Sequence, residues 1–168
     1  MFDAHRQNNP ALIRAETLLA SGDIAAASDT LNSLRAIAPN DPRIYSVFAQ
    51  LAFVSRNPTA ALQAADHALS LATGWPRALM QRARALEQLG ELEQCLRACE
   101  AAFLADSRLL SAVELAVNVG RRLGNTAVPE ALLRTAHQND PLNASIWLGL
   151  GRFLSRYKRD EAIAWLQK

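Results

Sequence analysis

The sequence of 168 residues has little cysteine, little lysine and few aromatic residues. Its two cysteines, Cys95 and Cys99, are four positions apart on one predicted helix, where disulfide geometry is poor. No apolar run approaches the roughly 18–20 residues of a membrane span. The N-terminal residues MFDAHRQNNP lack the apolar core of a signal peptide. These absences argue against a disulfide framework and against membrane insertion, and we expect a cytoplasmic protein.

The chain also has little excess charge. Its formal net charge of +2 is too small for a general nucleic-acid or membrane binder. Lys158 and Lys168 are the only lysines among 18 basic residues, so nearly all positive charge is carried by arginine. The guanidinium fork grips carboxylates and phosphates bidentately, whereas lysine acts as a point charge.

The sequence also lacks the residue patterns that are typical of metal-binding and catalytic sites. His5, His67 and His137 are far apart, and none pairs with the cysteines at metal-ligand spacing. No nucleophile elbow, glycine-rich phosphate loop or carboxylate pair stands in a recognisable frame. Trp75 and Trp165 are interpreted as packing residues, and the sparse aromatics disfavour single-stranded nucleic acid as a ligand. We expect no catalytic residue, no metal and no cofactor.

What the sequence does contain is a repeat with a period of 34 residues. One column of positions separated by this period is Ala15, Ala49, Ala83, Val117 and Gly151. A second is Ala27, Ala61 and Cys95, and a third is Leu34, Ala68, Ala102 and Ala136. A period in this range is typical of stacked helical units, which form extended binding grooves.

The period divides the chain into about four and a half helix pairs, which we treat as a single repeat domain. The unit bounds are approximately 8–41, 42–75, 76–109, 110–143 and an incomplete 144–168. Gly22 is expected to end a helix in the left-handed conformation, and Asp41 to cap the next helix with Pro42 at its first position. In the following turn we expect Asn57, and not Arg56, to take the left-handed conformation.

Two features depart from the regular pattern. Pro129 occupies the small-residue position of a second helix, so we expect that helix to start about two residues late, with Pro129 in its first turn. No polar capping helix follows Lys168, although the ends of such stacks usually need one. We expect the chain to be part of a longer protein, with a naturally ragged end as the alternative.

These offsets resemble the tetratricopeptide repeat (TPR) family. First-helix positions of the family pattern are matched by Trp147, Leu150, Gly151 and Leu154. The second half of the pattern is matched by Gly22, Ala27, Leu31, Leu34 and Pro39 in the first unit, and by Leu86, Gly90, Cys95, Cys99 and Ala102 in the third. The resemblance covers the chain after its first seven residues. It implies an all-α fold, a right-handed superhelical solenoid of antiparallel helix pairs.

The repeated residue sizes predict how the helices pack. Small residues let two helices approach closely, and large apolar residues fill the space to the next unit. The expected contact points between helices are Ala15, Ala49, Ala83 and Gly151. Cys95 and Cys99 stand in packing columns and are expected in the core.

The resemblance further implies that the first helices line a concave face that binds extended or helical peptides. Its candidate ligand-groove residues are Arg43, Gln50, Arg77, Met80, Arg84, Glu87, Asn118, Arg121, Arg122, Arg152 and Arg156. Ser46, Phe53, Val54, Gln88, Ser111 and Glu114 occupy the remaining outward positions. The excess of arginine over acid suggests an acidic or phosphate-bearing ligand. The alternative is that arginine simply fills solvated helix faces.

One TPR subtype clamps the terminal carboxylate of chaperone tails with two Lys, two Asn and an Arg. The corresponding positions here carry Ser46, Gln50, Gln81, Ser111 and Leu115. A chaperone-tail clamp is therefore not expected.

We predict a non-enzymatic scaffold that binds a partner protein or peptide in the arginine-lined groove. The alternative is an N-terminal substrate-positioning or regulatory arm of a larger transferase-type enzyme. This arrangement resembles bacterial TPR arrays fused to sulfotransferase, methyltransferase or glycosyltransferase domains. Self-association through the uncapped C-terminal end is a further interaction that the sequence would allow.

Overall fold

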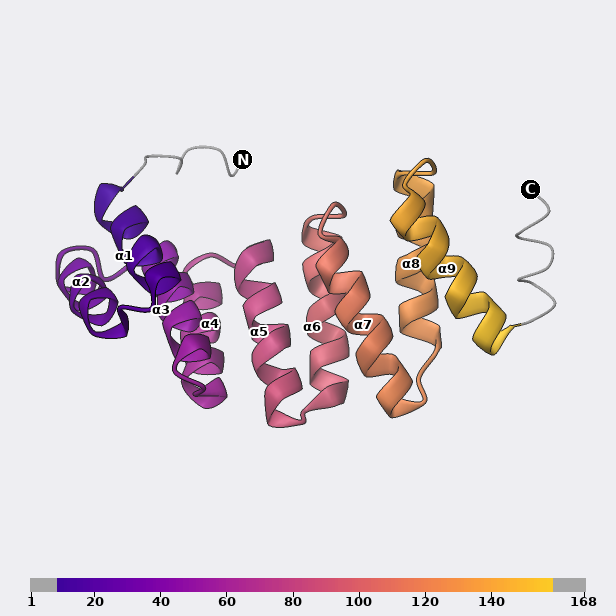
Figure 1. Cartoon of the computed structure of the whole chain (residues 1–168), viewed down its shortest axis with the longest axis horizontal. Helices are drawn as coiled ribbons and strands as arrows, with labels where there is room; N and C mark the ends of the chain where they lie inside the picture. The colour runs from indigo at the N-terminus through magenta and orange to yellow at the C-terminus, as the bar shows by residue number, and fades with distance from the viewer. Residues whose placement is uncertain (1–8, 159–168) are drawn as a thin grey trace. The chain divides into compact units, whose positions relative to one another are not determined.

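The computed structural model describes residues 9–158, and every regular element in that range is an α-helix (Figure 1). The helices are α1 (Pro10–Ser21), α2 (Ile24–Ile37), α3 (Pro42–Val54), α4 (Pro58–Leu71), α5 (Pro76–Leu89), α6 (Leu92–Ala105), α7 (Leu110–Leu123), α8 (Ala127–Asn139) and α9 (Ala144–Tyr157). They follow one another as the predicted helix pairs, so the predicted all-α, TPR-like solenoid fold is confirmed for these residues. The predicted second helix of the fifth pair lies outside the described residues.

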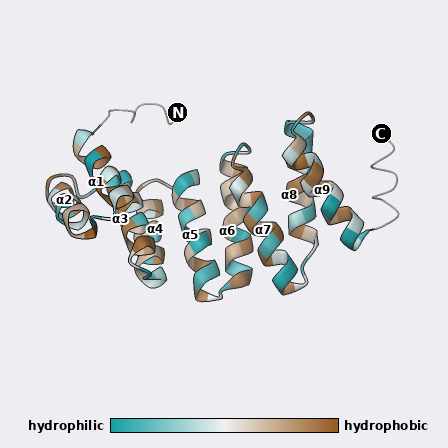
Figure 2. Ribbon diagram, in the orientation of Figure 1, coloured by the Kyte–Doolittle hydropathy of each residue, from teal (hydrophilic) through white to brown (hydrophobic). Residues whose placement is uncertain are grey.

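The helices belong to two compact units, residues Met1–Gly90 and Glu91–Lys168. In the first unit α1 packs on α2, and α3 packs on both α4 and α5. In the second unit α7 packs on α6 and α8, and α8 packs on α9. Hydrophilic and hydrophobic residues alternate around each helix, as expected for helices that bury one side (Figure 2).

The helix ends follow the predicted turn chemistry. Gly22 has a φ of 84° and closes α1 in the left-handed conformation. Asp23 caps α2 by accepting a hydrogen bond from the Ala26 amide, at 3.1 Å. Asp41 accepts one from the Arg43 amide at 3.0 Å, with Pro42 at the start of α3. These local signals fix where each helix begins, and with it the register of the repeat.

The prediction for the turn between α3 and α4 is wrong. Arg56 takes the positive φ of 54°, whereas Asn57 has a φ of −115°. Asn57 instead caps α4, its Oδ1 accepting a hydrogen bond from the Ala60 amide at 3.0 Å. Because Pro58 restricts the residue before it to extended conformations, the left-handed residue is displaced to Arg56.

Pro129 lies in the first turn of α8, as expected. The helix begins at Ala127, one residue later than the period of 34 counted from Leu92 gives, and not two as predicted. Its ring packs against Gly120 of α7, where an added Cβ would overlap the Pro129 Cγ and come within 2.6 Å of the Asn125 carbonyl oxygen. Pro129 is bulkier than the small residues at the equivalent positions of the other units. Gly120 on the facing helix makes room for it.

The repeated small residues are buried as predicted in the first unit. Ala15, Ala49 and Ala83 have no exposed surface. Gly151 differs, because no atom lies within 4 Å of a Cβ added there. The helix that it was expected to contact lies outside the described residues. Cys95 and Cys99 are fully buried thiols, which confirms their predicted place in the core.

A buried polar pair ties α3 to α5 within the first unit. The Ser46 hydroxyl donates to Gln81 Oε1 at 3.0 Å, and Gln81 Nε2 donates to the Ser46 carbonyl oxygen at 2.9 Å. Both side chains are buried. Ser46 and Gln81 thus satisfy each other's hydrogen-bonding groups at a place that water does not reach. A shift of α5 along α3 would break both hydrogen bonds and leave buried polar groups without a partner.

Replacement of Ala83 or Ala49 by leucine tests the close helix contacts. Each substitution forces three further carbon atoms into a site with no free surface, so we expect a destabilisation of about 1–3 kcal/mol. Urea denaturation followed by circular dichroism measures it. Ala25→Leu, at an exposed position of α2, is the matched control. If Ala83→Leu and Ala49→Leu unfold at the same urea concentration as that control, the proposed packing is wrong.

Gly120→Ala tests the contact with Pro129. Helix propensity alone would make this change stabilising by about 1 kcal/mol. We expect the opposite sign, because the new methyl group meets both the Pro129 ring and a backbone oxygen. The free energy of unfolding from urea titration gives the sign directly, and a stabilised variant would contradict the packing of α7 on α8.

Candidate functional site

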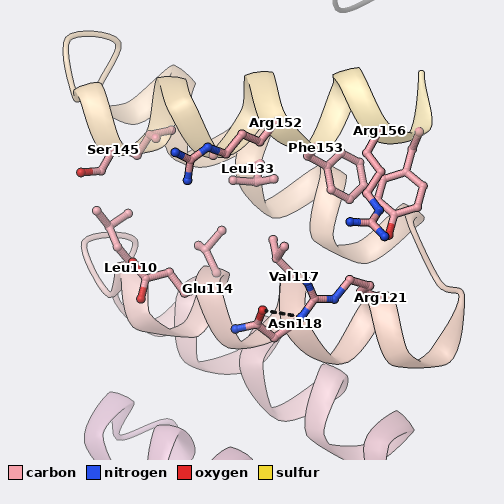
Figure 3. Close-up of a pocket in the computed structure, with 14 residues that line it drawn as sticks. Leu110, Glu114, Val117, Asn118, Arg121, Leu133, Ser145, Arg152, Phe153 and Arg156 are labelled. Carbon is pink, nitrogen blue, oxygen red and sulfur yellow. Dashed lines mark hydrogen bonds between the residues drawn. The ribbon is translucent and has the colours of Figure 1, made fainter. Parts of the chain in front are cut away.

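The second unit contains a cavity of about 480 Å³ between α7 and α9, with Leu133 of α8 contributing to its lining (Figure 3). We call it the α7–α9 groove. Its polar lining residues are Glu114, Asn118, Arg121, Ser145, Arg152 and Arg156. Its other lining residues are Leu110, Val113, Val117, Leu133, Ile146, Gly149, Phe153 and Tyr157. On each helix these residues recur every three or four positions, which places them on one face.

Three exposed arginines dominate the charge of the α7–α9 groove, against the single carboxylate of Glu114. Arg121 Nη2 donates a long 3.5 Å hydrogen bond to Asn118 Oδ1, and the Arg156 guanidinium lies 6.0 Å from the centre of the Tyr157 ring. Among residues 9–158, no carboxylate forms an ion pair with Arg121, Arg152 or Arg156. Most of their donors thus face solvent or the groove.

The charges are distributed unevenly along the groove. Figure 3 shows Arg121 and Arg156 approaching each other from α7 and α9 at one end, with Glu114 and Ser145 toward the other. Leu133 and Val117 lie between them. The Arg152 side chain extends toward Ser145. The groove therefore combines an apolar middle with two arginines at one end and with Arg152 and Glu114 toward the other.

A buried carboxylate holds the end of α9 in place. Glu130 of α8 accepts hydrogen bonds from Arg134 Nε at 2.9 Å and from Lys158 Nζ, just beyond α9, at 3.0 Å. Burial raises the pKa of Glu130, but the hydrogen bonds from Lys158 and Arg134 outweigh it and leave the pKa below its ordinary value. Because Lys158 is two positions from Arg156, this network positions the charged end of the groove.

The structure brings four of the predicted groove residues together in the α7–α9 groove: Asn118, Arg121, Arg152 and Arg156. Arg122 is exposed and does not line it. Glu114, one of the other predicted outward positions, lines it as well. The remaining lining residues were absent from the predicted site. Phe153 and Tyr157 could have been found from their spacing of four along a predicted helix. Leu133 lies on α8, the second helix of its repeat unit, and no signal in the sequence connects it with this groove.

In the first unit, internal carboxylates bind two of the predicted groove arginines. Arg43 pairs with Asp41 at 2.7 Å, and this hydrogen-bonded contact raises the pKa of Arg43. Arg77 of α5 pairs with Glu16 of α1, also at 2.7 Å. These two arginines therefore already have anionic partners within the unit.

The remaining predicted residues on α3 and α5 differ in exposure. Arg84 is exposed, and Gln50 and Glu87 are half-buried. Met80 is only 7% exposed and belongs to the core of the first unit.

The described residues form a helical-repeat fold built from antiparallel helix pairs. The tetratricopeptide repeat family matches residues 1–51 in sequence. The predicted resemblance to this family is confirmed by that match and by the same fold in the solved structures described below. No curated protein matches the chain significantly.

Several solved structures share the fold at low sequence identity. MamA aligns with a TM-score of 0.73 and 14% identity over 94% of this chain and 86% of its own. PilF of Pseudomonas aeruginosa aligns with a TM-score of 0.73 and 17% identity over 94% and 71%. The first TPR domain of Spaghetti (RPAP3), bound to the HSP90 peptide SRMEEVD, aligns with a TM-score of 0.65 and 17% identity over 68% and 90%. At these low sequence identities, the structural alignments show only that the fold is shared.

The TPR fold is in general a non-catalytic scaffold for protein–protein interaction, and TPR domains bind proteins or peptides, as the RPAP3 complex illustrates. Within residues 9–158, no helix combines the length and the apolar character needed to cross a membrane. The fold is thus one that interaction scaffolds use, whereas the role and the ligand of this chain have to be argued from the groove.

Glu130→Gln tests the network at the end of α9. A carboxyl with a lowered folded-state pKa adds stability that is complete above its ordinary pKa and is lost as the pH falls through the folded-state pKa. We expect the variant to be less stable than the parent by about 1–2 kcal/mol at neutral pH. The difference should shrink as the solution is acidified below the ordinary glutamate pKa of 4.5. Urea titrations across this pH range measure it.

Glu100→Gln is the control for this experiment, because Glu100 is an exposed glutamate of α6. It should change stability little at any pH. A pH-independent loss in Glu130→Gln would show that the substitution acts through packing and that the ion pairs contribute nothing.

Proposed function

We propose that this chain is a protein-interaction scaffold that binds an acidic partner segment in the α7–α9 groove. The observation that carries the proposal is the set of three exposed arginines that line one cavity without an ion-pair partner among residues 9–158. Guanidinium groups form short, charge-assisted and often bidentate hydrogen bonds with carboxylates and phosphates. A ligand that supplies such groups would satisfy donors that the fold leaves unused.

The apolar middle of the groove limits the ligand further. Val117, Leu133 and Phe153 offer a surface for an apolar side chain, next to the charged end formed by Arg121 and Arg156. The cavity volume of about 480 Å³ has room for only a few side chains. These features favour a short segment that combines carboxylates or phosphates with at least one apolar side chain.

The first unit offers a weaker anion site on its first helices. Arg43 and Arg77 are each bound by an internal carboxylate, so an incoming anion would have to displace it. The RPAP3 domain binds SRMEEVD, a peptide rich in acidic residues, which illustrates such a ligand on this fold. The residues of the chaperone-tail clamp are missing here, so we propose recognition through the arginines of α7 and α9 instead.

The test compares partner binding by two charge-matched variants. The first carries Arg121→Gln, Arg152→Gln and Arg156→Gln. The control carries Arg14→Gln, Arg84→Gln and Arg97→Gln, three exposed arginines that do not line the groove. Partners captured from native lysate are identified, and the acidic segment of each is titrated by calorimetry at low and at high salt.

We expect the groove variant to bind the segment at least about tenfold more weakly, since several charge-assisted contacts are lost. Its binding should also depend less on salt than that of the parent. The control should bind like the parent. Equal affinities of parent and groove variant would contradict the proposal and assign these arginines to the solvated surface.

A further inference from the structure

A second cavity, of about 420 Å³, lies in the first unit over α2, α3 and α4. We call it the α2–α4 groove. It is lined by Tyr45, Phe48 and Ala52 of α3 and by Ser55, the residue that caps the end of α3. These positions are three or four residues apart and so share one face. At 100° per residue, that face is opposite the one carrying Arg43 and the other predicted ligand positions of α3. The α2–α4 groove is therefore separate from any site on the first-helix face.

The groove is elongated and has an apolar floor. Its lining extends from Tyr45 of α3 to Ser55 at the cap of that helix, a length of about 15 Å, and along α4 to His67. Phe48 and Leu51 are only half-buried and line it together with Ala64. A groove of this length accommodates roughly four to five residues of extended chain.

One end of the groove is cationic and rigid. The Arg35 guanidinium lies over the Phe48 ring, 5.3 Å from its centre, and donates to Asn32 Oδ1 at 3.0 Å. The Tyr45 ring lies 4.0 Å from that of His67. Because a guanidinium has five N–H donors, Arg35 retains several for another partner.

The lining contains no acidic residue to balance this charge. The Tyr45 hydroxyl donates to the Pro39 carbonyl oxygen at 2.7 Å, which fixes the aromatic ring without neutralising the site. An unbalanced guanidinium beside an exposed aromatic surface is complementary to a ligand that carries a carboxylate next to an apolar group.

We propose that the α2–α4 groove binds a second acidic protein segment, which places an apolar side chain on Phe48 and Leu51 and a carboxylate on Arg35. It shares no residue with the α7–α9 groove. The chain can therefore hold two different segments at once, one on each unit. Linking two such contacts raises the overall affinity of a partner that carries both segments.

Gln63 provides a sharp test, because its exposed side chain lines the groove and has no role in the core. Gln63→Glu adds a repelling carboxylate with the same shape, and Gln63→Lys adds an attracting ammonium on a longer side chain. Arg35→Gln removes the proposed carboxylate partner. Arg14→Gln, at an exposed position of α1, is the control for loss of one positive charge.

Random peptides about as long as the groove, displayed on phage, are selected on the full chain. That chain carries Arg121→Gln, Arg152→Gln and Arg156→Gln, so the α7–α9 groove does not contribute. The enriched peptides are synthesised and titrated by fluorescence anisotropy against each variant in this background. The result is thus independent of whether the α7–α9 groove binds a partner.

The proposal predicts enriched peptides with an acidic residue beside an apolar one. Their affinity should fall at least about fivefold with Gln63→Glu and with Arg35→Gln, rise with Gln63→Lys, and stay unchanged with Arg14→Gln. Failure to enrich any peptide would overturn the proposal. So would peptides without acidic residues, or equal binding by the Gln63→Glu and Gln63→Lys proteins.

Discussion

The close approach of neighbouring helices at fully buried small residues is the constraint on which the rest of this structure depends. Ala15, Ala49 and Ala83 have no exposed surface, and Gly120 leaves no room for a methyl group against Pro129. These small residues fix the spacing between the helices, and one side of each helix is buried against its neighbours. The opposite side is left to hold charged residues, and unpaired charge collects where no internal carboxylate reaches it, as in the α7–α9 groove.

Most of the fold could be predicted from the sequence because its signals are local and repeat. The period of 34 residues gives the order of the helices, and turn residues such as Gly22 and Asp41 give their ends. The one wrong turn residue had a local cause as well. Asn57 caps α4 and precedes Pro58, which restricts it to extended conformations. The left-handed conformation is therefore found at Arg56.

The candidate site was less predictable, because its chemistry depends on contacts between distant residues. Helical offsets, which need only the repeat register, grouped Arg121, Arg152 and Arg156, which line one cavity, together with Arg122, which does not line it. They could not show that Arg77 would pair with Glu16, a residue 61 positions away. Nor could they show that Met80 would be buried. The α2–α4 groove went unnoticed because its aromatic residues look like core residues in a sequence, and only the structure shows them half-exposed.

The most direct test of the account is nuclear magnetic resonance of the arginine side chains during titration with an acidic peptide such as hexaglutamate. The guanidinium Nε–H signals report each arginine separately. The account predicts that the signals of Arg121, Arg152 and Arg156 shift together and at the lowest peptide concentration, before that of Arg77, which Glu16 already occupies. A uniform shift of all exposed arginines, or a shift of Arg77 at a lower peptide concentration than these three, would contradict the assignment of anion binding to the α7–α9 groove.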